Sequence, residues 1–395
     1  MFAKHLAASL ALLASSTLGA QRAPVSGTFV STLGTDTIQV ERYTLNGDKL
    51  EGDILRKSPR VQIVHYVADL ASGKFKGISV TSRAYPADPA SPPGFSMVAL
   101  MSDTSASLEV QRAGRPDSVN TGIKSIKGRA APAVPGTPPS LGVYEQILAF
   151  NPPVGKDSVT VGLIGAGLPP NSTLKLWRRS RDSVSFLSSF FPGWIEAANV
   201  DPNGRIQSMD ASATTVKAYT RRVASLDFDA TAKAWAAYEA AHGRMGQISP
   251  ADTLRATVGN ANVEIAYSRP LKRGRAIFGS NIVPWNQVWR TGANAATQFT
   301  TSADLMFGST LIPAGKYTLW TLPTPTGAKL IFNSQTGQWG TDYDAAKDFA
   351  RVDLVQSILA KPVEQFTFAI VPQGTGAVLR YSWDDREYSI PFRSK

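Results

Sequence analysis

The stretch DTIQVERYTLNGDKLEGDILR, residues 36–56, decides the fold class of the N-terminal half of the chain. In an extended conformation Ile38 and Val40 lie on one face, and the polar residues beside them lie on the other. The same alternation returns after Asn46-Gly47, a dipeptide typical of the tight turn of a hairpin. The sequence therefore predicts two antiparallel strands joined by a short turn.

The segments that follow this hairpin extend it into an antiparallel meander. RVQIVHYVADL and KFKGISVTSRAY come next, and a proline-rich stretch, GRAAPAVPGTPPSLG, lies at residues 128–142. Its four prolines and lack of periodicity are typical of a long exposed loop. Strand-like segments then resume with VYEQILAF, DSVTVGLI, STLKLWRR, DSVSFLSSF, WIEAANV and TTVKAYTRR. We predict one N-terminal all-β domain over residues 24–225, similar to a half-barrel; the alternative is two smaller units divided at the proline-rich loop.

One segment has the composition of a helix. DFDATAKAWAAYEAAHG, residues 227–243, is rich in alanine, begins with aspartates that can cap a helix, and ends at a glycine. Trp235 and Tyr238 are three positions apart, so they fall on one helical face. The segment is predicted to be a linker helix whose role is packing between domains.

Short alternating segments return over residues 250–395. They are NVEIAYS, ATQFTTS, GKYTLW, AKLIFN, EQFTFAIV, AVLRYSW and REYSIPF, and Gly or Pro turns separate most of them. Asp384-Asp385 is expected to turn the chain between the last two. The pattern is typical of a β-sandwich or a jelly-roll-like domain, so the whole chain is predicted to be mainly β.

The N-terminal residues 1–20 have the features of a cleaved signal peptide. Lys4 precedes a short apolar stretch that ends near Leu18, and Gly19 and Ala20 are small enough for signal peptidase. The stretch is too short to span a membrane comfortably, and no later segment approaches that length. We expect export to the periplasm or the extracellular space, without a transmembrane segment in the mature chain.

Composition narrows the chemistry further. The chain has no cysteine, which excludes disulfides, thiolate nucleophiles and cysteine metal sites. The formal net charge is +11, with basic clusters at residues 175–181 and 269–275. No nucleic-acid-binding motif accompanies this charge, so we expect a solvated basic face and no nucleic-acid partner.

The C-terminal part resembles a family of exported bacterial proteins, the domain of unknown function 2911. The matching residues are YSRP (267–270), GRAIFG (274–279), VPWNQVWRTGANAATQF (283–299), IPAGKYTLWTLP (312–323), IFNSQTGQWGTDYD (331–344) and the closing YSWDDREYSIPF. WRTGAN together with PAGKYTLW is specific. The resemblance implies an exported, β-rich domain of the Gram-negative envelope, but no activity, cofactor or catalytic residue.

The aromatic and polar residues of this part suggest a ligand site. Four of the eight tryptophans lie within residues 285–339, close to arginine, asparagine and aspartate. Exposed tryptophans stack on the apolar faces of sugars, and planar polar groups bind the hydroxyls. The candidate ligand-binding residues are Arg290, Asn294, Trp289, Trp320, Trp339, Tyr343, Asp344 and Arg269.

A structural interpretation of the same loop competes with the functional one. In it Arg290 pairs with a carboxylate such as Asp344 or Glu264, and Asn294 caps the turn that Gly292 permits. The tryptophans would then be buried, with the indole N–H groups bonded inside the fold. The functional alternative has Arg290 pointing outward to an anionic or hydroxylated ligand.

Other motifs favour structural roles. After the predicted signal peptide the only histidines are His65, within an apolar strand, and His242, near a helix end. Neither lies in the C-terminal domain, so a histidine-based triad or zinc site there is excluded. GLIGAGLPPN lacks the third glycine of a dinucleotide loop and is expected to be a strand end and a turn. TDYDAAKD, residues 341–348, is expected to be a capped helical turn, with calcium as the lesser alternative. The catalytic residues are unknown, and no metal or cofactor is expected.

Three functional hypotheses remain open. The first is an exported, non-enzymatic envelope protein whose C-terminal domain binds a ligand such as a glycan. The second is a hydrolase that uses carboxylates such as Asp342, Asp344 or Glu264. The third is a structural or lipid-carrier envelope protein, which needs a large apolar cavity in the N-terminal domain.

Overall fold

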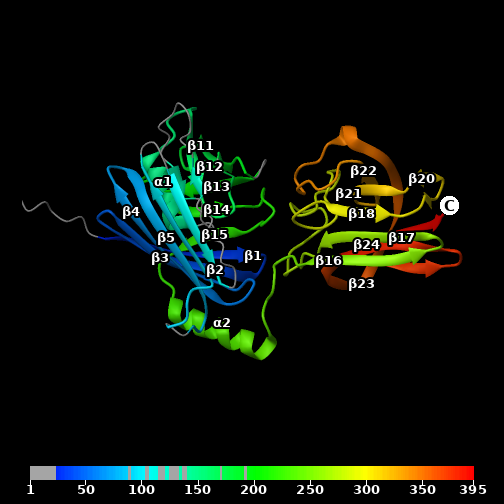
Figure 1. The fold of residues 1–395 in the computed structure, drawn as a ribbon, viewed down its shortest axis with the longest axis horizontal. Coiled ribbons are helices and arrows are strands. Elements are labelled where there is room, and N and C mark those ends of the chain that lie inside the picture. The colour runs from blue at the N-terminus through cyan, green and yellow to red at the C-terminus, as the bar shows by residue number, and fades with distance from the viewer. Residues whose placement is uncertain are drawn as a thin grey trace, which may run out of the picture.

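The computed structural model describes residues 24–87, 90–102, 106–113, 121–123, 133–135, 140–169, 171–190 and 194–395. The predicted signal peptide at residues 1–20 and most of the proline-rich stretch at residues 128–142 lie outside this set. The described chain is mainly β, as the alternating segments predict, with one large sheet in each half (Figure 1).

The N-terminal half forms a sheet of 15 described strands that curls into a nearly closed half-barrel (Figure 1). Its order is β8-β7-β6-β5-β4-β3-β2-β1-β15-β14-β13-β12-β11-β10-β9, and all neighbours are antiparallel except β9 and β10. The strands are β1 (Val25–Leu33), β2 (Asp36–Asn46), β3 (Lys49–Arg56), β4 (Gln62–Ala71), β5 (Lys74–Ala84), β6 (Phe95–Met101), β7 (Ala106–Arg112), β8 (Thr121–Ile123), β9 (Ala133–Pro135), β10 (Ser158–Ile164), β11 (Thr173–Ser180), β12 (Ser183–Ser188), β13 (Ile195–Val200), β14 (Ile206–Asp210) and β15 (Tyr219–Val223).

The predicted hairpin of residues 36–56 lies at the centre of this sheet as β2 and β3. Gly47 turns the chain with φ 58°, in the left-handed region that glycine adopts without strain. Both faces of β2 are covered: Val40 belongs to the cluster beneath the linker helix, and Tyr43 belongs to the main N-terminal core. The face of β2 that carries its polar residues is therefore packed against other parts of the protein and is not exposed to solvent.

The first helix, α1 (Leu141–Phe150), corrects a prediction, because VYEQILAF had the pattern of a strand. Seven of its ten residues are buried, so no polar stripe reveals the helical period. Ser140 caps it, with its hydroxyl accepting from the Val143 N–H at 3.2 Å. The helix packs in the main core of the half-barrel, where the lipid-carrier hypothesis needs an apolar cavity.

Glu41 on β2 fixes the start of α1. This carboxylate is 1% exposed and accepts from the N–H groups of Leu141 (2.7 Å) and Gly142 (3.0 Å). The hydroxyls of Ser140 (2.8 Å) and Tyr66 (2.9 Å) also donate to it. Burial raises the pKa of Glu41, while these four donors act in the opposite direction. The unsatisfied amides of the helix N-terminus are thereby bound by a residue of the sheet.

The second helix, α2 (Phe228–His242), is the predicted linker helix. Asp227 caps it through the Ala230 N–H at 2.9 Å, and Gly243 ends it with φ 83°. Phe228 and Ala232 bury the helix against the outer face of the half-barrel. Neither described helix has the length and apolar character that a membrane span requires.

The C-terminal half forms the second sheet, with nine described strands around one aromatic core. Its order is β16-β17-β18-β21-β22-β23-β24-β19-β20. The strands are β16 (Ala251–Val258), β17 (Ala261–Ser268), β18 (Thr297–Thr301), β19 (Leu305–Phe307), β20 (Thr310–Ile312), β21 (Gly315–Thr324), β22 (Gly327–Asn333), β23 (Asp348–Gln373) and β24 (Gly376–Ser394), and η1 (Ala345–Lys347) is a short 3₁₀ turn.

The last expected hairpin is absent, because AVLRYSW and REYSIPF form the single strand β24. Asp384 takes φ 53° without reversing the chain. Its carboxylate is bound by the Lys272 ammonium group, and the residue is only 8% exposed. The aspartate pair therefore bends a strand instead of forming an exposed turn.

Direct bonds join the two halves. The Arg273 guanidinium donates to Asp36 at 2.6 Å, and the backbone N–H of Thr35 donates to the Arg273 carbonyl at 3.3 Å. The Lys217 ammonium donates to the Asn281 carbonyl at 2.9 Å. These contacts place the loop after β1 and the loop before β15 against the loops that follow β17.

Candidate functional site

The loop VWRTGAN, residues 288–294, is held by backbone and side-chain bonds inside the C-terminal fold. Trp289 and Thr321 exchange two backbone hydrogen bonds of 2.8 Å. The hydroxyls of Thr291 and Thr321 lie 2.8 Å apart, and the Thr297 hydroxyl donates to the Thr291 carbonyl at 2.8 Å. Gly292 has φ 154°, and a Cβ there would lie 3.1 Å from the Ser268 carbonyl oxygen. The loop is thus a fixed element of the fold.

Two of the predicted aromatic platforms are buried. Trp289 is 6% exposed and stacks on Trp383, with ring centroids 6.0 Å apart. Trp320 is 1% exposed, and its indole N–H donates to the Thr318 hydroxyl at 3.0 Å. The Tyr343 ring lies against Trp320 at 4.9 Å. In this conformation Trp289 and Trp320 offer no ring face to a sugar in solvent.

Arg290 has neither of the surroundings that the sequence suggests. Among the described residues no carboxylate pairs with it, since Glu264 pairs with Arg255 at 2.8 Å and Asp344 caps the turn η1. One guanidinium N–H reaches the Gly340 carbonyl at 3.4 Å, and the buried Nε has no hydrogen-bond partner among the described residues. Burial lowers the pKa of Arg290 to about 10. The residue is a half-buried cation without a counter-ion in the described chain.

Glycine at position 340 allows this arrangement. A Cβ there would lie 2.0 Å from Arg290 Cδ and 2.4 Å from the Asn294 carbonyl oxygen. The Gly340 N–H donates to that carbonyl at 3.0 Å. The segment of Trp339 therefore lies directly on the WRTGAN loop, and it also makes a bridge to Ala295.

The remaining candidates are spread over several contacts. The Asn294 side chain (φ 60°) donates to the Ser249 carbonyl and the Ser268 hydroxyl, both at 3.4 Å. The Tyr343 hydroxyl donates to Asp348 at 2.7 Å. Arg269 donates to Asp252 at 3.1 Å and to the Thr367 hydroxyl at 2.7 Å. Of the eight candidates, Trp289 and Arg290 line one pocket together.

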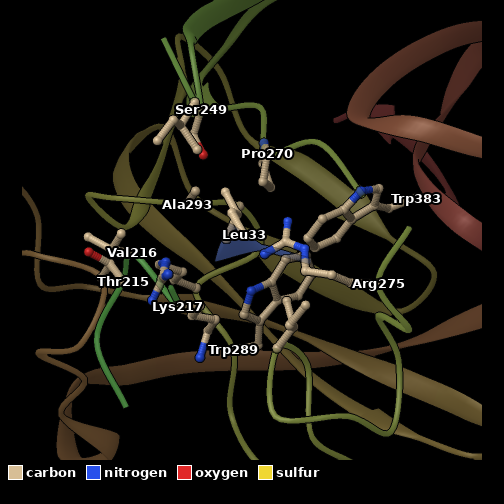
Figure 2. Close-up of a pocket in the computed structure, with 14 residues that line it drawn as sticks. Leu33, Thr215, Val216, Lys217, Ser249, Pro270, Arg275, Trp289, Ala293 and Trp383 are labelled. Atoms are coloured by element: carbon tan, nitrogen blue, oxygen red, sulfur yellow. The ribbon is translucent and has the colours of Figure 1, made fainter. Parts of the chain in front are cut away.

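That pocket, which we call the junction pocket, lies where the two halves meet (Figure 2). Leu33, Thr215, Val216 and Lys217 line it from the N-terminal half. From the C-terminal half it is lined by Ile248, Ser249, Pro270, Arg275, Ile282, Trp289, Arg290, Gly292, Ala293 and Trp383. Figure 2 shows Arg275 beside the rings of Trp289 and Trp383, with Leu33 next to it. Its cavity volume is about 30 Å³, enough for a small ion or a few atoms of a larger ligand.

Three cations and no carboxylate line the junction pocket: Lys217, Arg275 and Arg290. Burial, followed by the charges of Arg290 and Arg275, lowers the pKa of Lys217 to about 8. Burial and the Arg273 charge lower the pKa of Arg275 to about 10. Since like charges and burial both disfavour a cation, the arrangement is electrostatically suited to an anion.

The ammonium group of Lys217 has three N–H donors. Within the described chain two of them donate to the Ser212 and Asn281 carbonyls, both at 2.9 Å, which leaves the third for a ligand. Arg275 likewise donates from Nε to the Lys272 carbonyl at 2.8 Å and from Nη2 to the Leu271 carbonyl. Carbonyl oxygens hold both cations in place. The charges of Asp210 near Lys217, and of Glu364 and Asp36 near Arg275, offset only part of the effect of burial and like charge on their pKa values.

Sequence reasoning did not find Lys217. It lies in a segment with the alternation of a strand and belongs to no motif. Its φ of 54° is in the left-handed region, which a lysine in the sequence does not predict. Arg275 was visible only as one member of a basic cluster. Both join Arg290 through tertiary structure, so no spacing in the sequence brings them together.

The other titratable candidates have structural partners. His65 lies 2.9 Å from Asp53, and this hydrogen bond raises the pKa of the imidazole. TDYDAAKD contains the expected capped turn, in which Asp344 accepts from the Ala346 N–H at 2.9 Å. GLIGAGLPPN is the end of β10 followed by a turn, as expected. No group of three or more potential metal ligands occurs in the described ranges.

Fold and site together define a two-sheet, mainly β protein with a cationic pocket at the junction of its halves. Residues 249–392 match the family described as protein of unknown function (DUF2911), which confirms the resemblance of the C-terminal part. None of the curated proteins compared with the chain matches it.

Two solved structures show only remote similarity. One is a DUF1089 family protein from Pseudomonas aeruginosa, with 9% identity and a TM-score of 0.31, covering 44% of this chain and 90% of that chain. The other is the polysaccharide lyase Uly1, with 7% identity and a TM-score of 0.12, covering 89% of each chain. At these scores neither likeness carries an argument about the fold or the function.

Proposed function

We propose that this is an exported binding protein of the cell envelope whose ligand carries a negatively charged group. The proposal places that group in the junction pocket, within reach of Lys217, Arg275 and Arg290. The observation that carries it is the convergence of three cations in a pocket that no carboxylate lines. A cation removed from water without a partner costs free energy, and an anion offsets that cost.

The size of the junction pocket limits which classes of ligand can enter it. A cavity volume of about 30 Å³ accepts a carboxylate or a small inorganic anion, but not a sugar ring. The carbohydrate hypothesis is thereby restricted to sugars that carry an acid group and present it to the pocket. Export rests on the N-terminal residues 1–20, whose charged start and apolar stretch have the features of a signal peptide.

The test compares the thermal stability of the full chain with and without anions at constant ionic strength. Sodium phosphate, acetate and glucuronate are the probes, and glucose is the uncharged reference. An anion that binds the folded state stabilises it, by about 2.7 kcal/mol when its concentration is a hundred times Kd. Arg290→Met keeps an unbranched apolar stem and removes the guanidinium charge, so it should abolish most of this gain.

Arg290→Met has a second expected effect. Without any anion the variant should be at least as stable as the wild type, because an uncompensated cation is removed. Arg221→Met, at an exposed residue of β15, is the matched control and should keep the full response. A wild type indifferent to all three anions, or a response equal in Arg290→Met, would contradict the proposal.

A further inference from the structure

A second, larger cavity lies beside α2 and shares no lining residue with the junction pocket. We call it the helix pocket. Its lining residues are Asp36, Lys57, Val61, Ala234, Trp235, Tyr238, Glu239, His242, Gly243, Arg244, Met245, Leu271 and Arg273. The cavity volume is about 570 Å³, within the range of roughly 300–1,000 Å³ that small-molecule sites occupy.

One wall of the helix pocket is aromatic and apolar. Trp235 is partly buried and packs against the cluster between α2 and the half-barrel. The Lys57 ammonium lies 4.7 Å from the centre of the Trp235 ring. Tyr238 is 64% exposed and stacks on His242, with ring centroids 4.2 Å apart. Leu271 of the C-terminal half lines the same pocket and adds an aliphatic side chain to these rings.

The acidic residues of the helix pocket already have partners. Asp36 is bound by Arg273 at 2.6 Å, and Glu239 accepts from the Val61 N–H at 2.6 Å. Both carboxylates therefore have partners within the fold, and the Asp36 charge also favours the charged form of Lys57.

The basic residues are less committed. In the part of the chain that the structure describes, neither Lys57 nor Arg244 forms a salt bridge. The Arg273 side chain is 7% exposed, and its buried Nε has no hydrogen-bond partner within the described ranges. Burial lowers the pKa of Lys57. The helix pocket is thus lined by three lysine and arginine residues and two acidic ones, so its lining has an excess of positive charge.

We propose that the helix pocket binds a small amphipathic anion. The apolar body of the ligand packs against Trp235 and Leu271, and its carboxylate or similar group binds Lys57 and Arg244. Flat aromatic acids and alkyl-chain acids share this chemistry, and both fit the volume. Such a ligand touches the half-barrel, α2 and the C-terminal half at once, because all three line the pocket.

Calorimetric titration of the full chain tests the inference. The probes are 2-naphthoate, laurate below its micellar concentration, and 2-naphthalenemethanol as the neutral analogue of the first. We expect the naphthoate or the laurate to bind, and the stronger of the two identifies the ligand body. The neutral analogue should bind at least about tenfold more weakly, since a charged hydrogen bond contributes about 1.5–3 kcal/mol.

Lys57→Gln removes the ammonium group and should weaken anion binding about tenfold, as expected for one charge-assisted bond. Trp235→Leu should weaken binding of both the acid and the neutral analogue, because it removes the apolar wall. Lys233→Gln, exposed on the same helix and outside the pocket, is the matched control and should bind like the wild type.

Three outcomes would overturn the inference: no binding of either acid, equal binding of the neutral analogue, or equal affinity in Lys57→Gln and Lys233→Gln. The helix pocket is independent of the junction pocket, so Arg290→Met should leave these affinities unchanged. A failure at one pocket is thereby distinguished from a failure at the other.

Discussion

Trp289 and Arg290 are neighbours in the sequence, and both line the junction pocket. The Trp289 ring also packs edge-on to Phe366 at 5.4 Å inside an aromatic core, so it forms part of the apolar wall, whereas Arg290 contributes a positive charge. The sequence identified the loop, but the density of tryptophans could not show which rings are buried.

Lys217 provides a pH-dependent prediction. Its pKa is lowered from 10.5 to about 8, so at pH 8.5 much of the amine is neutral when the junction pocket holds no anion. A bound anion favours the charged form, and binding should therefore be accompanied by proton uptake at pH 8.5 and by little at pH 6.5. Acetate, which is ionised at both pH values, is titrated in two buffers of different ionisation enthalpy to measure this uptake.

The variant Lys217→Met controls that measurement, because it should lose the uptake at pH 8.5. The same pKa sets a sign for stability without an anion: between about pH 8 and 10.5 the unfolded chain holds the proton that the folded chain has lost. The contribution of Lys217 to stability should rise over that window. Uptake that persists in Lys217→Met would assign the proton to another group.

At the scale of elements, the two helices differ in how far the sequence reveals them. α2 lies on the surface of the half-barrel and carries its own signals, the cap Asp227 and the end Gly243, so its bounds follow from local chemistry. α1 is buried on nearly all sides, and its first amides are bound by Glu41, about a hundred positions earlier. A helix stabilised by distant residues cannot be distinguished from a buried strand by periodicity.

The close packing of α1 makes Gly142 a sensitive position. A Cβ there would lie 2.5 Å from the Tyr66 hydroxyl oxygen and 2.8 Å from Tyr43 Cγ. Gly142→Ala should lower the free energy of unfolding by about 1–3 kcal/mol, as overpacking does, although alanine favours helices. Urea denaturation measures the change. Gly94→Ala is the control, because the nearest atom to its Cβ would be 3.8 Å away, and an equal loss there would contradict the explanation.

At the scale of the molecule, alternation and turns predicted the mainly β class and the N-terminal meander. The similarity of that meander to half-barrel proteins suggested its curvature, and the family resemblance located the C-terminal part. They could not predict the junction, because its contacts join residues such as Asp36 and Arg273, 237 positions apart. Each half has its own hydrophobic cluster, over residues 29–209 and 258–392. The halves therefore share little core, and their contact is largely polar.

This arrangement predicts the behaviour of the C-terminal half alone. Residues 249–395 contain a complete aromatic cluster, so we expect them to fold with the circular dichroism of a β protein. They lack Lys217, so their affinity for phosphate should be at most about a tenth of the affinity of the full chain. This is the loss expected for one charge-assisted hydrogen bond. An isolated half that keeps the full response would show that the anion binds elsewhere.

Both halves of the molecule line the junction pocket, so binding of an anion there is coupled to the contact between the halves. Lys217 belongs to one half of the molecule and Arg290 to the other, so an anion that contacts both binds best when the halves are docked. Thermodynamic linkage is reciprocal. Docking of the halves raises the affinity for the anion by a certain factor, and the bound anion raises the equilibrium constant for docking by the same factor. Repulsion between the cations of the empty pocket works in the other direction. The ligand would then regulate how tightly the half-barrel and the DUF2911-like part are held together.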